Sequence, residues 1–145
     1  MNRFIAVAAA GLTLAAAPVP EEWNVDPSHT AVTFSVKHFF TPVEGQFDDF
    51  EISVLYDEEN PANSSVEARI AVASVNTNND RRDEHLRSED FFEAEAHPYI
   101  TFKSTSVRPV SDGKFVATGD LTIKGVTQQV ELPVEVLGIQ EIPPQ

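Results

Sequence analysis

One stretch of the sequence, Asn78 to Pro98, concentrates side chains that often take part in catalysis or metal binding. Its 21 residues include three arginines, two histidines, seven carboxylates and two adjacent phenylalanines. A histidine oriented by a carboxylate can act as a general base, because its ordinary pKa of about 6.5 lies near neutral pH. General acid–base chemistry is therefore one hypothesis for this stretch, and its candidate residues are Arg81, Arg82, Asp83, His85, Glu89, Asp90 and His97.

The rest of the sequence does not favour an enzyme. It contains no Gly-rich phosphate loop, no nucleophile elbow and no His-Glu-x-x-His pattern, and it has no cysteine. Of its four histidines, His29 and His38 are nine residues apart, and His85 and His97 are twelve apart. Neither spacing is typical of metal ligands. We therefore predict a protein that is not an enzyme, with no catalytic residue, no metal and no cofactor.

A structural role for the same stretch is the alternative that the residue types favour. Arg82 and Asp83 would pair with each other or with backbone groups, because the planar guanidinium suits fixed pairing. His85 would donate a hydrogen bond from a ring nitrogen. We predict a structural lid over one end of the fold, with Leu86, Phe91 and Phe92 as its plug; its residues are Arg82, Asp83, His85, Leu86, Phe91 and Phe92. Contact of Arg81, Arg82 or Arg87 with an anionic head group stays open.

The lid is expected to contain the only helix of the fold. Ser88 followed by Glu89 and Asp90 is typical of a helix N-cap with acids in the first turn, and His97-Pro98 is a stop signal. This pattern predicts a short helix near residues 88–96.

The segments around this stretch are predicted to be strands. Apolar residues alternate with polar ones in six of them, 31–38, 50–56, 66–72, 99–107, 115–123 and 130–136. Turn signals lie at 41–45, 57–65 and 111–113, and Lys124-Gly125 is expected to form a two-residue hairpin. Regularly spaced strands of this kind predict an all-β, antiparallel barrel or sandwich with one short helix.

One face of these strands is almost entirely apolar. Its side chains could fill the interior as a core, or they could line a cavity for an apolar ligand. His38 ends such a face, so it could be a core histidine that bonds a neighbouring hydroxyl or carbonyl, or it could bond the head of a ligand. The residues expected to point inward are Val32, Phe34, Val36, Ile52, Val54, Ile70, Phe102, Phe115, Leu121, Val130 and Leu132.

The N-terminus and the net charge indicate where the protein works. Arg3, an uncharged run over residues 4–17 and a small-residue stretch are typical of a secretory signal peptide, here assigned to residues 1–20. One domain of residues 21–145 follows. The apolar run is shorter than the roughly 20 residues of a membrane span, so we expect no stable anchor after cleavage. The net charge of −13 repels nucleic acid.

Three segments resemble the signature segments of the YceI-like family, bacterial secreted proteins with a lipocalin-like barrel that bind polyisoprenoid lipids. The segments are WNVDPSHTAVTFSVKHF, SVNTNNDRRDEHLRSEDFFEAEAHPYITFKST and GDLTIKGVTQQVEL, and the match runs in family order from Trp23 to Val136. The family often has His or Arg where this chain has Lys124. It also continues with further strands after Val136, so the resemblance implies that this chain lacks the last strands of the barrel.

The resemblance implies an apolar tunnel that holds an isoprenoid chain, with its polar head near the mouth. The predicted ligand-binding residues are Val32, Phe34, Val36, His38, Ile52, Val54, Phe102, Phe115, Leu121, Val130 and Leu132. The function predicted is a periplasmic or secreted protein that sequesters or transports a prenyl quinone or a prenyl phosphate. A stress or protein-interaction module with a filled barrel is the second hypothesis, and an isoprenoid-modifying enzyme is the third. The predicted partner is an isoprenoid lipid, and formation of a homodimer is left open.

Overall fold

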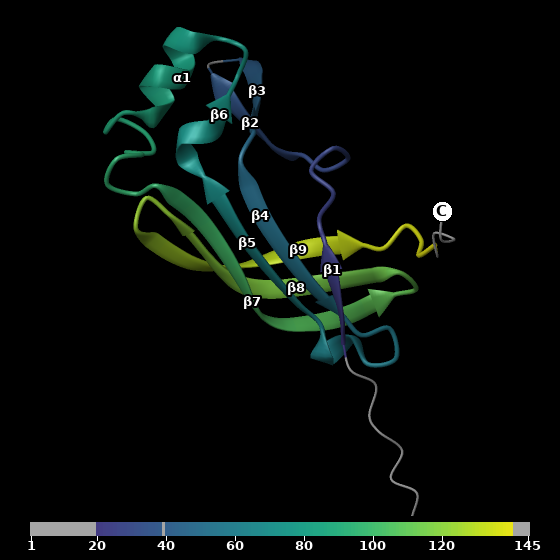
Figure 1. Ribbon diagram of the computed structural model, residues 1–145. Helices are drawn as coiled ribbons and strands as arrows, with labels where there is room; N and C mark the ends of the chain where they lie inside the picture. The colour runs from purple at the N-terminus through teal and green to yellow at the C-terminus, as the bar shows by residue number, and fades with distance from the viewer. Residues whose placement is uncertain (1–19, 39, 141–145) are drawn as a thin grey trace, which may run out of the picture.

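The computed structural model describes residues 20–38 and 40–140, and nearly all of its regular structure is β-strand (Figure 1). The single α-helix in this part of the chain is α1 (Asp80–Arg87), and two 3-10 turns accompany it, η1 (Pro61–Asn63) and η2 (Val72–Ser74). The strands are β1 (Glu21–Asn24), β2 (Val32–His38), β3 (Thr41–Phe47), β4 (Phe50–Tyr56), β5 (Ser65–Ala71), β6 (Val75–Asn76), β7 (Tyr99–Ser111), β8 (Lys114–Ile123) and β9 (Val126–Glu135).

The strands form two antiparallel sheets. The larger sheet has six strands in the order β1-β4-β5-β7-β8-β9, and the smaller has three in the order β2-β3-β6. Figure 1 shows α1 beside the smaller sheet at one end of the molecule, with the β4–β5 connection at the opposite end of the long sheet. The predicted all-β, antiparallel class with one short helix is confirmed.

All six strands predicted from alternation are present, but three further strands were not predicted. β1 and β6 are too short to show a period, with four and two residues. The turn expected at 41–45 is wrong, because these residues belong to β3 and pair with β2 from His38↔Thr41 to Val32↔Phe47. Pro42 and Gly45 suggested a turn, yet β3 tolerates both.

The helix lies one segment earlier than the sequence pattern predicted. It spans Asp80–Arg87 and not 88–96, and its N-cap is Asn79, whose side chain accepts a hydrogen bond from the Arg82 N–H at 3.0 Å. Ser88, expected to begin the helix, is instead its C-cap and donates its hydroxyl to the His85 carbonyl at 2.7 Å. Both ends of the eight-residue helix therefore carry a polar cap.

The hairpin at Lys124-Gly125 is confirmed. Ile123 and Val126 pair directly on either side of it, and Lys124 and Gly125 have φ angles of 48° and 72°. Two consecutive positive φ values are those of a type I′ turn, which matches the twist of the flanking strands. Lys124 is thus a non-glycine residue held in the left-handed region by the turn.

The buried side chains form two clusters. The first, beneath α1, consists of Phe47, Val72, Val75 and Ile100, with Leu86 and Phe92 packed against it. The second consists of Phe102, Val107, Phe115 and Ala117. Among the residues that the structure describes, Leu121 alone packs against both clusters. The interior is therefore divided into a half under the helix and a half under the long sheet.

The opposite face of the long sheet is polar and carries ion pairs. Lys103 and Glu67 approach to 2.7 Å across β7 and β5, and the Arg69 guanidinium lies 3.7 Å from the centre of the Tyr99 ring. The hydrogen bond from Lys103 to Glu67 raises the pKa of Lys103 above its ordinary value. Within residues 20–38 and 40–140, no helix has the length and apolar character needed to cross a membrane.

Candidate functional site

An apolar cavity of about 210 Å³ opens beside the second cluster, at the end of the molecule far from α1. Val107, Phe115 and Ala117 are buried and form its floor, whereas Trp23, Leu55 and Ile139 are 37 to 48% exposed and form its rim. The complete set of lining residues is Trp23, Val54, Leu55, Tyr56, Ser64, Val66, Val107, Phe115, Ala117, Val134, Val136 and Ile139.

Strand register brings these residues together from distant parts of the sequence. Trp23 pairs with Val54, and Val54 pairs with Val66 on its other side. Residues directly opposite each other in neighbouring strands share a face of the sheet. The same relation places Phe115 on β8 opposite Val134 on β9. Because β1 and β9 are the two edge strands of the long sheet, the cavity is bounded by strands from both edges of this sheet.

Side-chain size along β8 explains why space remains here. The Phe115 ring meets Tyr56 edge-on with 6.0 Å between ring centres, and this contact closes one side of the cavity. The next inward residue is Ala117, which is 1% exposed and carries only a methyl group. A small residue beside a large one on the same face leaves a hollow that the neighbouring strands do not fill.

The connection between β4 and β5 stands at the edge of the cavity and is organised by Asp57. Its buried carboxylate accepts hydrogen bonds from the Asn60 N–H at 2.7 Å and from the Asn63 side-chain amide at 2.9 Å. These bonds, the Asn63 amide first, lower the pKa of Asp57 below its ordinary value. The Asp57 N–H also donates to the hydroxyl of Ser64, a lining residue, at 3.0 Å.

Two of the eleven predicted ligand-binding residues, Val54 and Phe115, line this cavity. Phe102 belongs to the buried second cluster, and Val130 packs against that cluster. Leu121 packs against both clusters. These three side chains therefore lie in packed core beside the cavity.

The other predicted ligand-binding residues lie farther away. Val32 and Phe34 pack against the first cluster, and Ile52 is half-buried on β4. Val36 is 51% exposed, and Leu132 on β9 is 40% exposed. The side chain of His38 lies outside the described part of the structure.

Trp23, Tyr56, Val66 and Val107 are the main lining residues that the sequence prediction missed. Tyr56 is two residues after the predicted inward residue Val54, and Val66 is four residues before the predicted inward residue Ile70, so each shares a strand face with a predicted residue. Alternation therefore identified the correct face, but it could not tell which level along the strand would be hollow.

The predicted structural lid is organised around Thr77. Arg82 donates from Nε to the Thr77 hydroxyl and from a terminal nitrogen to the Thr77 carbonyl, both at 2.7 Å. The buried Asp83 carboxylate accepts from the Thr77 N–H at 2.9 Å and also from its hydroxyl. Arg82 and Asp83 thus both bond the side chain and the backbone of Thr77. Of the two predicted arrangements, pairing with each other or with backbone groups, the structure shows the second.

The aromatic residues of the lid have different roles. Phe92 packs on Phe47 with 6.0 Å between ring centres, and Leu86 packs on the same cluster. Phe91 does not plug the interior, because it is 49% exposed and lies edge-on against the His85 ring at 4.8 Å. His85 Nε2 is 3.1 Å from an Asp90 carboxylate oxygen.

Two cations fasten the lid segment to its surroundings. Arg87 donates to the carbonyls of Ala73 and Val75 at 3.2 and 3.4 Å. Lys124, in the β8–β9 hairpin, donates to the Glu89 carbonyl at 2.7 Å. The basic residue of this turn therefore ties a hairpin of the long sheet to the connection that follows α1.

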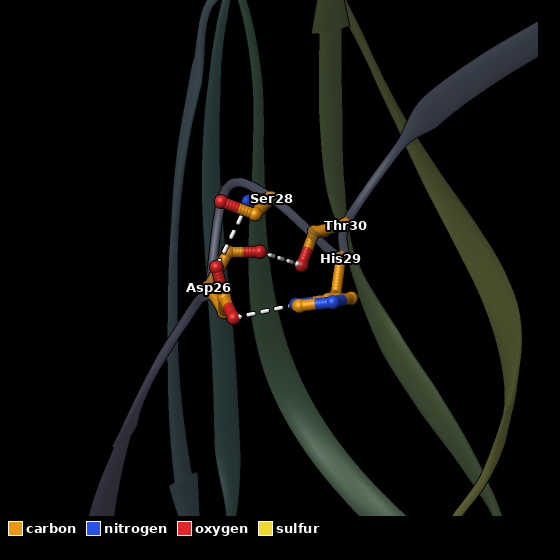
Figure 2. A network of polar contacts seen from close by, with 4 residues as sticks. All are labelled: Asp26, Ser28, His29 and Thr30. Atoms are coloured by element: carbon orange, nitrogen blue, oxygen red, sulfur yellow. Dashed lines mark hydrogen bonds and ion pairs between the residues drawn. The ribbon is translucent and has the colours of Figure 1, made fainter.

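The histidines are found in separate places. His29 Nδ1 lies 2.7 Å from the Asp26 carboxylate in an exposed turn, where Ser28 N–H and the Thr30 hydroxyl also bond Asp26 (Figure 2). His29, the strongest contributor, and Ser28 lower the pKa of Asp26 below its ordinary value. Among residues 20–38 and 40–140, no three His, Cys, Asp or Glu side chains gather in a group able to hold a metal ion.

Comparison with known sequences finds curated relatives over most of the described chain. UPF0312 protein plu2095 of Photorhabdus laumondii is 40% identical over 116 residues, which are 79% of this chain and 60% of the relative. Protein YceI of Escherichia coli O157:H7 is 39% identical over 127 residues, which are 86% of this chain and 66% of the relative. The chain thus spans about 60 to 66% of the length of these curated relatives.

Comparison with solved structures finds the same fold. BcnA of Burkholderia cenocepacia aligns with a TM-score of 0.78 and 32% identity, over 81% of this chain and 74% of that protein. The YCEI protein of Campylobacter jejuni aligns with a TM-score of 0.67 and 34% identity, over 85% of this chain and 72% of that protein. These neighbours have lipocalin-like barrels, so the lipocalin-like class predicted for this chain is confirmed.

The sequence also matches a family model over nearly all of the described residues. The match covers residues 23–142, which include the second half of β1, the lid segment, the other five strands of the long sheet and every residue that lines the cavity. Agreement in sequence, in fold and over this length leads to one assignment: the chain belongs to the family of the YceI-like domain.

Proposed function

We propose that this protein binds an isoprenoid chain in the apolar cavity of the long sheet and sequesters or transports the lipid without altering it chemically. The observation that carries the proposal is the lining of the cavity, which consists of apolar or aromatic side chains and one serine. Membership of a polyisoprenoid-binding family supports the same conclusion. Family proteins are generally binding proteins, which agrees with a role other than catalysis.

Burial of hydrocarbon would supply most of the affinity. Each methylene removed from water contributes about 0.8 kcal/mol, so even a short enclosed segment is held without a charged partner. The volume of about 210 Å³ is smaller than the roughly 300 Å³ at which sites for drug-sized ligands begin. The cavity therefore encloses one segment of a long prenyl tail, and we expect little selectivity for tail length.

The periplasm or the cell exterior is the proposed location. Residues 1–20 have the pattern of a signal peptide, although most of them lie outside the described residues. An oxidising compartment is compatible with a chain that contains no cysteine. A carrier in an aqueous compartment would also need an enclosed site, because an exposed prenyl tail aggregates in water.

The proposal is tested by identifying what the protein carries when it is made in bacteria. Native mass spectrometry of the purified protein, followed by organic extraction, should reveal a bound prenyl lipid. Repeated absence of any apolar molecule would contradict the proposal.

A matched pair of variants locates the site. Ala117→Leu adds three carbons at the buried floor of the cavity and should lower lipid content about tenfold, because it fills the space that the tail occupies. Ala73→Leu makes the same change at an exposed position beside the lid and should leave lipid content unchanged. Circular dichroism checks that both variants are folded. Full lipid content in folded Ala117→Leu would show that the tail lies elsewhere.

A further inference from the structure

We propose that two copies of this chain associate through the free edge of β9. The pairing segment is residues 126–132, which runs antiparallel to the same segment of a second copy and extends the long sheet. β9 is an edge strand of this sheet, and within residues 20–38 and 40–140 its only strand partner is β8. The cavity takes no part in this contact, because none of these seven residues lines it.

The backbone of this segment directs hydrogen-bonding groups toward the free edge. Ile123 and Val126 flank a two-residue turn, so they form a hydrogen-bonded pair, and such pairs recur at every second residue along an antiparallel ladder. The N–H and C=O groups of Thr127, Gln129 and Glu131 therefore point away from β8. A row of this kind is a template for pairing with another chain.

The segment has a defined beginning and end. It begins after Gly125, which belongs to the hairpin turn and has a φ of 72°. It ends before Pro133, two residues after Glu131, where the N–H that proline lacks would also have pointed away from β8. Proline is tolerated at such a position of an edge strand, and there it stops pairing with a further strand.

Apolar side chains on the inner face of this segment are exposed. Leu132 lies opposite the buried Ala117, and Val126 is six residues earlier on β9, so both belong to the inner face. Val126 is 61% exposed and Leu132 is 40% exposed. Ile123, which pairs with Val126, is 37% exposed. Contact with a second copy would remove this apolar surface from water.

One register uses the whole segment. In a pair centred on Gln129, Val126 lies directly opposite Leu132 of the second copy, and two-fold symmetry makes this contact twice. Centring the pair one residue later would place Pro133, which has no N–H, opposite Thr127. Centring it one residue earlier would shorten the paired segment, because the hairpin turn would then face Glu131.

The distribution of charge permits a second copy of the same chain at this edge. A net charge of −13 makes two copies repel each other in general. Residues 126–132, however, contain a single charged side chain, Glu131, and it lies 3.7 Å from the Arg108 guanidinium. In the register centred on Gln129, Glu131 faces Thr127, so the two copies do not oppose like charges along the paired strands.

Sedimentation velocity over a range of protein concentrations tests the association. The mass should rise from one copy to two between about 1 and about 100 µM protein. Val126→Lys places an ammonium opposite Leu132 and should raise the concentration needed for half association at least about tenfold. Val36→Lys is the matched control, because it makes the same change at a 51% exposed valine on β2 and should leave the association unchanged.

Three results would overturn the proposal. The first is a protein that stays monomeric at about 100 µM. The second is an equal effect of the two lysine variants, once circular dichroism has shown that both are folded. The third is growth beyond two copies, since a symmetric contact of this kind closes at the dimer.

Single cysteines then test the register, because the chain contains no cysteine of its own. Gln129→Cys places two sulfur atoms across the two-fold axis, where the Cα atoms of a hydrogen-bonded pair are about 5.5 Å apart and within reach of a disulfide. Thr127→Cys is the control on the same face of β9, since its counterpart in the second copy is roughly 13 Å away. Mild oxidation should produce a covalent dimer at least about tenfold faster with Gln129→Cys. Equal rates for the two variants would overturn the proposed pairing.

Discussion

Asp57 joins the wall of the cavity to the connection above it, so its ionisation links pH to the shape of the site. Its two carboxylate oxygens accept from Asn60 and Asn63, and its N–H reaches Ser64 in the cavity lining. A carboxylate that receives two hydrogen bonds is favoured over the neutral acid, which is why its pKa is lowered.

The pH dependence of stability follows from this shift. Because the pKa of Asp57 is lower in the folded protein than its ordinary value of 3.8, its contribution to the free energy of unfolding is fully present above pH 3.8. It is lost as the pH falls through the lower pKa of the folded state. We expect the urea midpoint to fall over this acidic window, and to fall less steeply in Asp57→Asn.

Equilibrium unfolding in urea between neutral pH and pH 3 measures this difference. Asp112→Asn removes the same charge from an exposed position in the β7–β8 turn and serves as the control. Identical acid sensitivity of the original protein and Asp57→Asn would contradict the assignment of this role to Asp57.

At the level of single residues, the kind of interaction that a side chain makes could be predicted from the sequence better than the place where the side chain lies. Arg82 and Asp83 were expected to pair with each other or with backbone groups, and both bond the backbone of Thr77. Thr77 itself was not foreseen, because a threonine between strand and helix carries no distinctive pattern. Phe91 and Phe92 are adjacent and chemically identical, yet only Phe92 packs on the core. Their difference depends on the path of the chain after α1, which local residue types do not specify.

At the level of elements, β3 depends on a close contact between a glycine and an aromatic ring. Phe34 on β2 pairs with Gly45 on β3, and its ring occupies the space above the glycine. A Cβ atom at position 45 would meet this ring and would lie 2.8 Å from the Thr77 methyl carbon. Gly45 therefore serves the packing of β3 against β2 and against the connection between β6 and α1, and not a turn.

Gly45→Ala should destabilise the protein by about 1–3 kcal/mol, because the added methyl overpacks the contact with Phe34. The measurement is the free energy of unfolding from urea titration. Gly138→Ala is the matched control, since a Cβ there has no neighbour within 4 Å. A Gly45→Ala protein as stable as the control would show that the Phe34 ring moves aside at little cost.

The same elements show why some boundaries could be predicted and others could not. Long strands with regular alternation were identified, because the period of two is a direct consequence of strand geometry. The helix was displaced because Asn79-Asp80 and Ser88-Glu89 are both acceptable N-terminal signals. Only tertiary contacts decide which of the two signals begins the helix. Here Asp83 is buried and Leu86 packs against the first cluster, so the helix begins at the earlier signal.

At the level of the whole molecule, the charge imbalance works against compactness. The formal net charge is −13. Each ion pair on the outer face of the sheet joins one positive and one negative charge, so these pairs leave the net charge unchanged. The excess carboxylates repel one another across the surface of the protein. Salt weakens this repulsion between charges that are farther apart than the Debye length, which is about 10 Å at 0.1 M. Exposed ion pairs contribute little, so their loss in salt should be the smaller effect.

We therefore expect sodium chloride to stabilise the protein, with a higher urea midpoint at about 200 mM than at about 10 mM salt. Near pH 4.5, where the net charge approaches zero, this gain should largely disappear. A midpoint that falls with added salt at neutral pH would mean that the ion pairs outweigh the overall repulsion.

The meeting of the two interior clusters at Leu121 also has an evolutionary consequence. Substitutions of the exposed rim residues Trp23, Leu55 and Ile139 should cost less folding stability than substitutions in either buried cluster. Descendants of one ancestral sequence could in this way acquire different guests while retaining the same scaffold. Diversification of cargo would then proceed by drift at one end of the molecule, under purifying selection at the other.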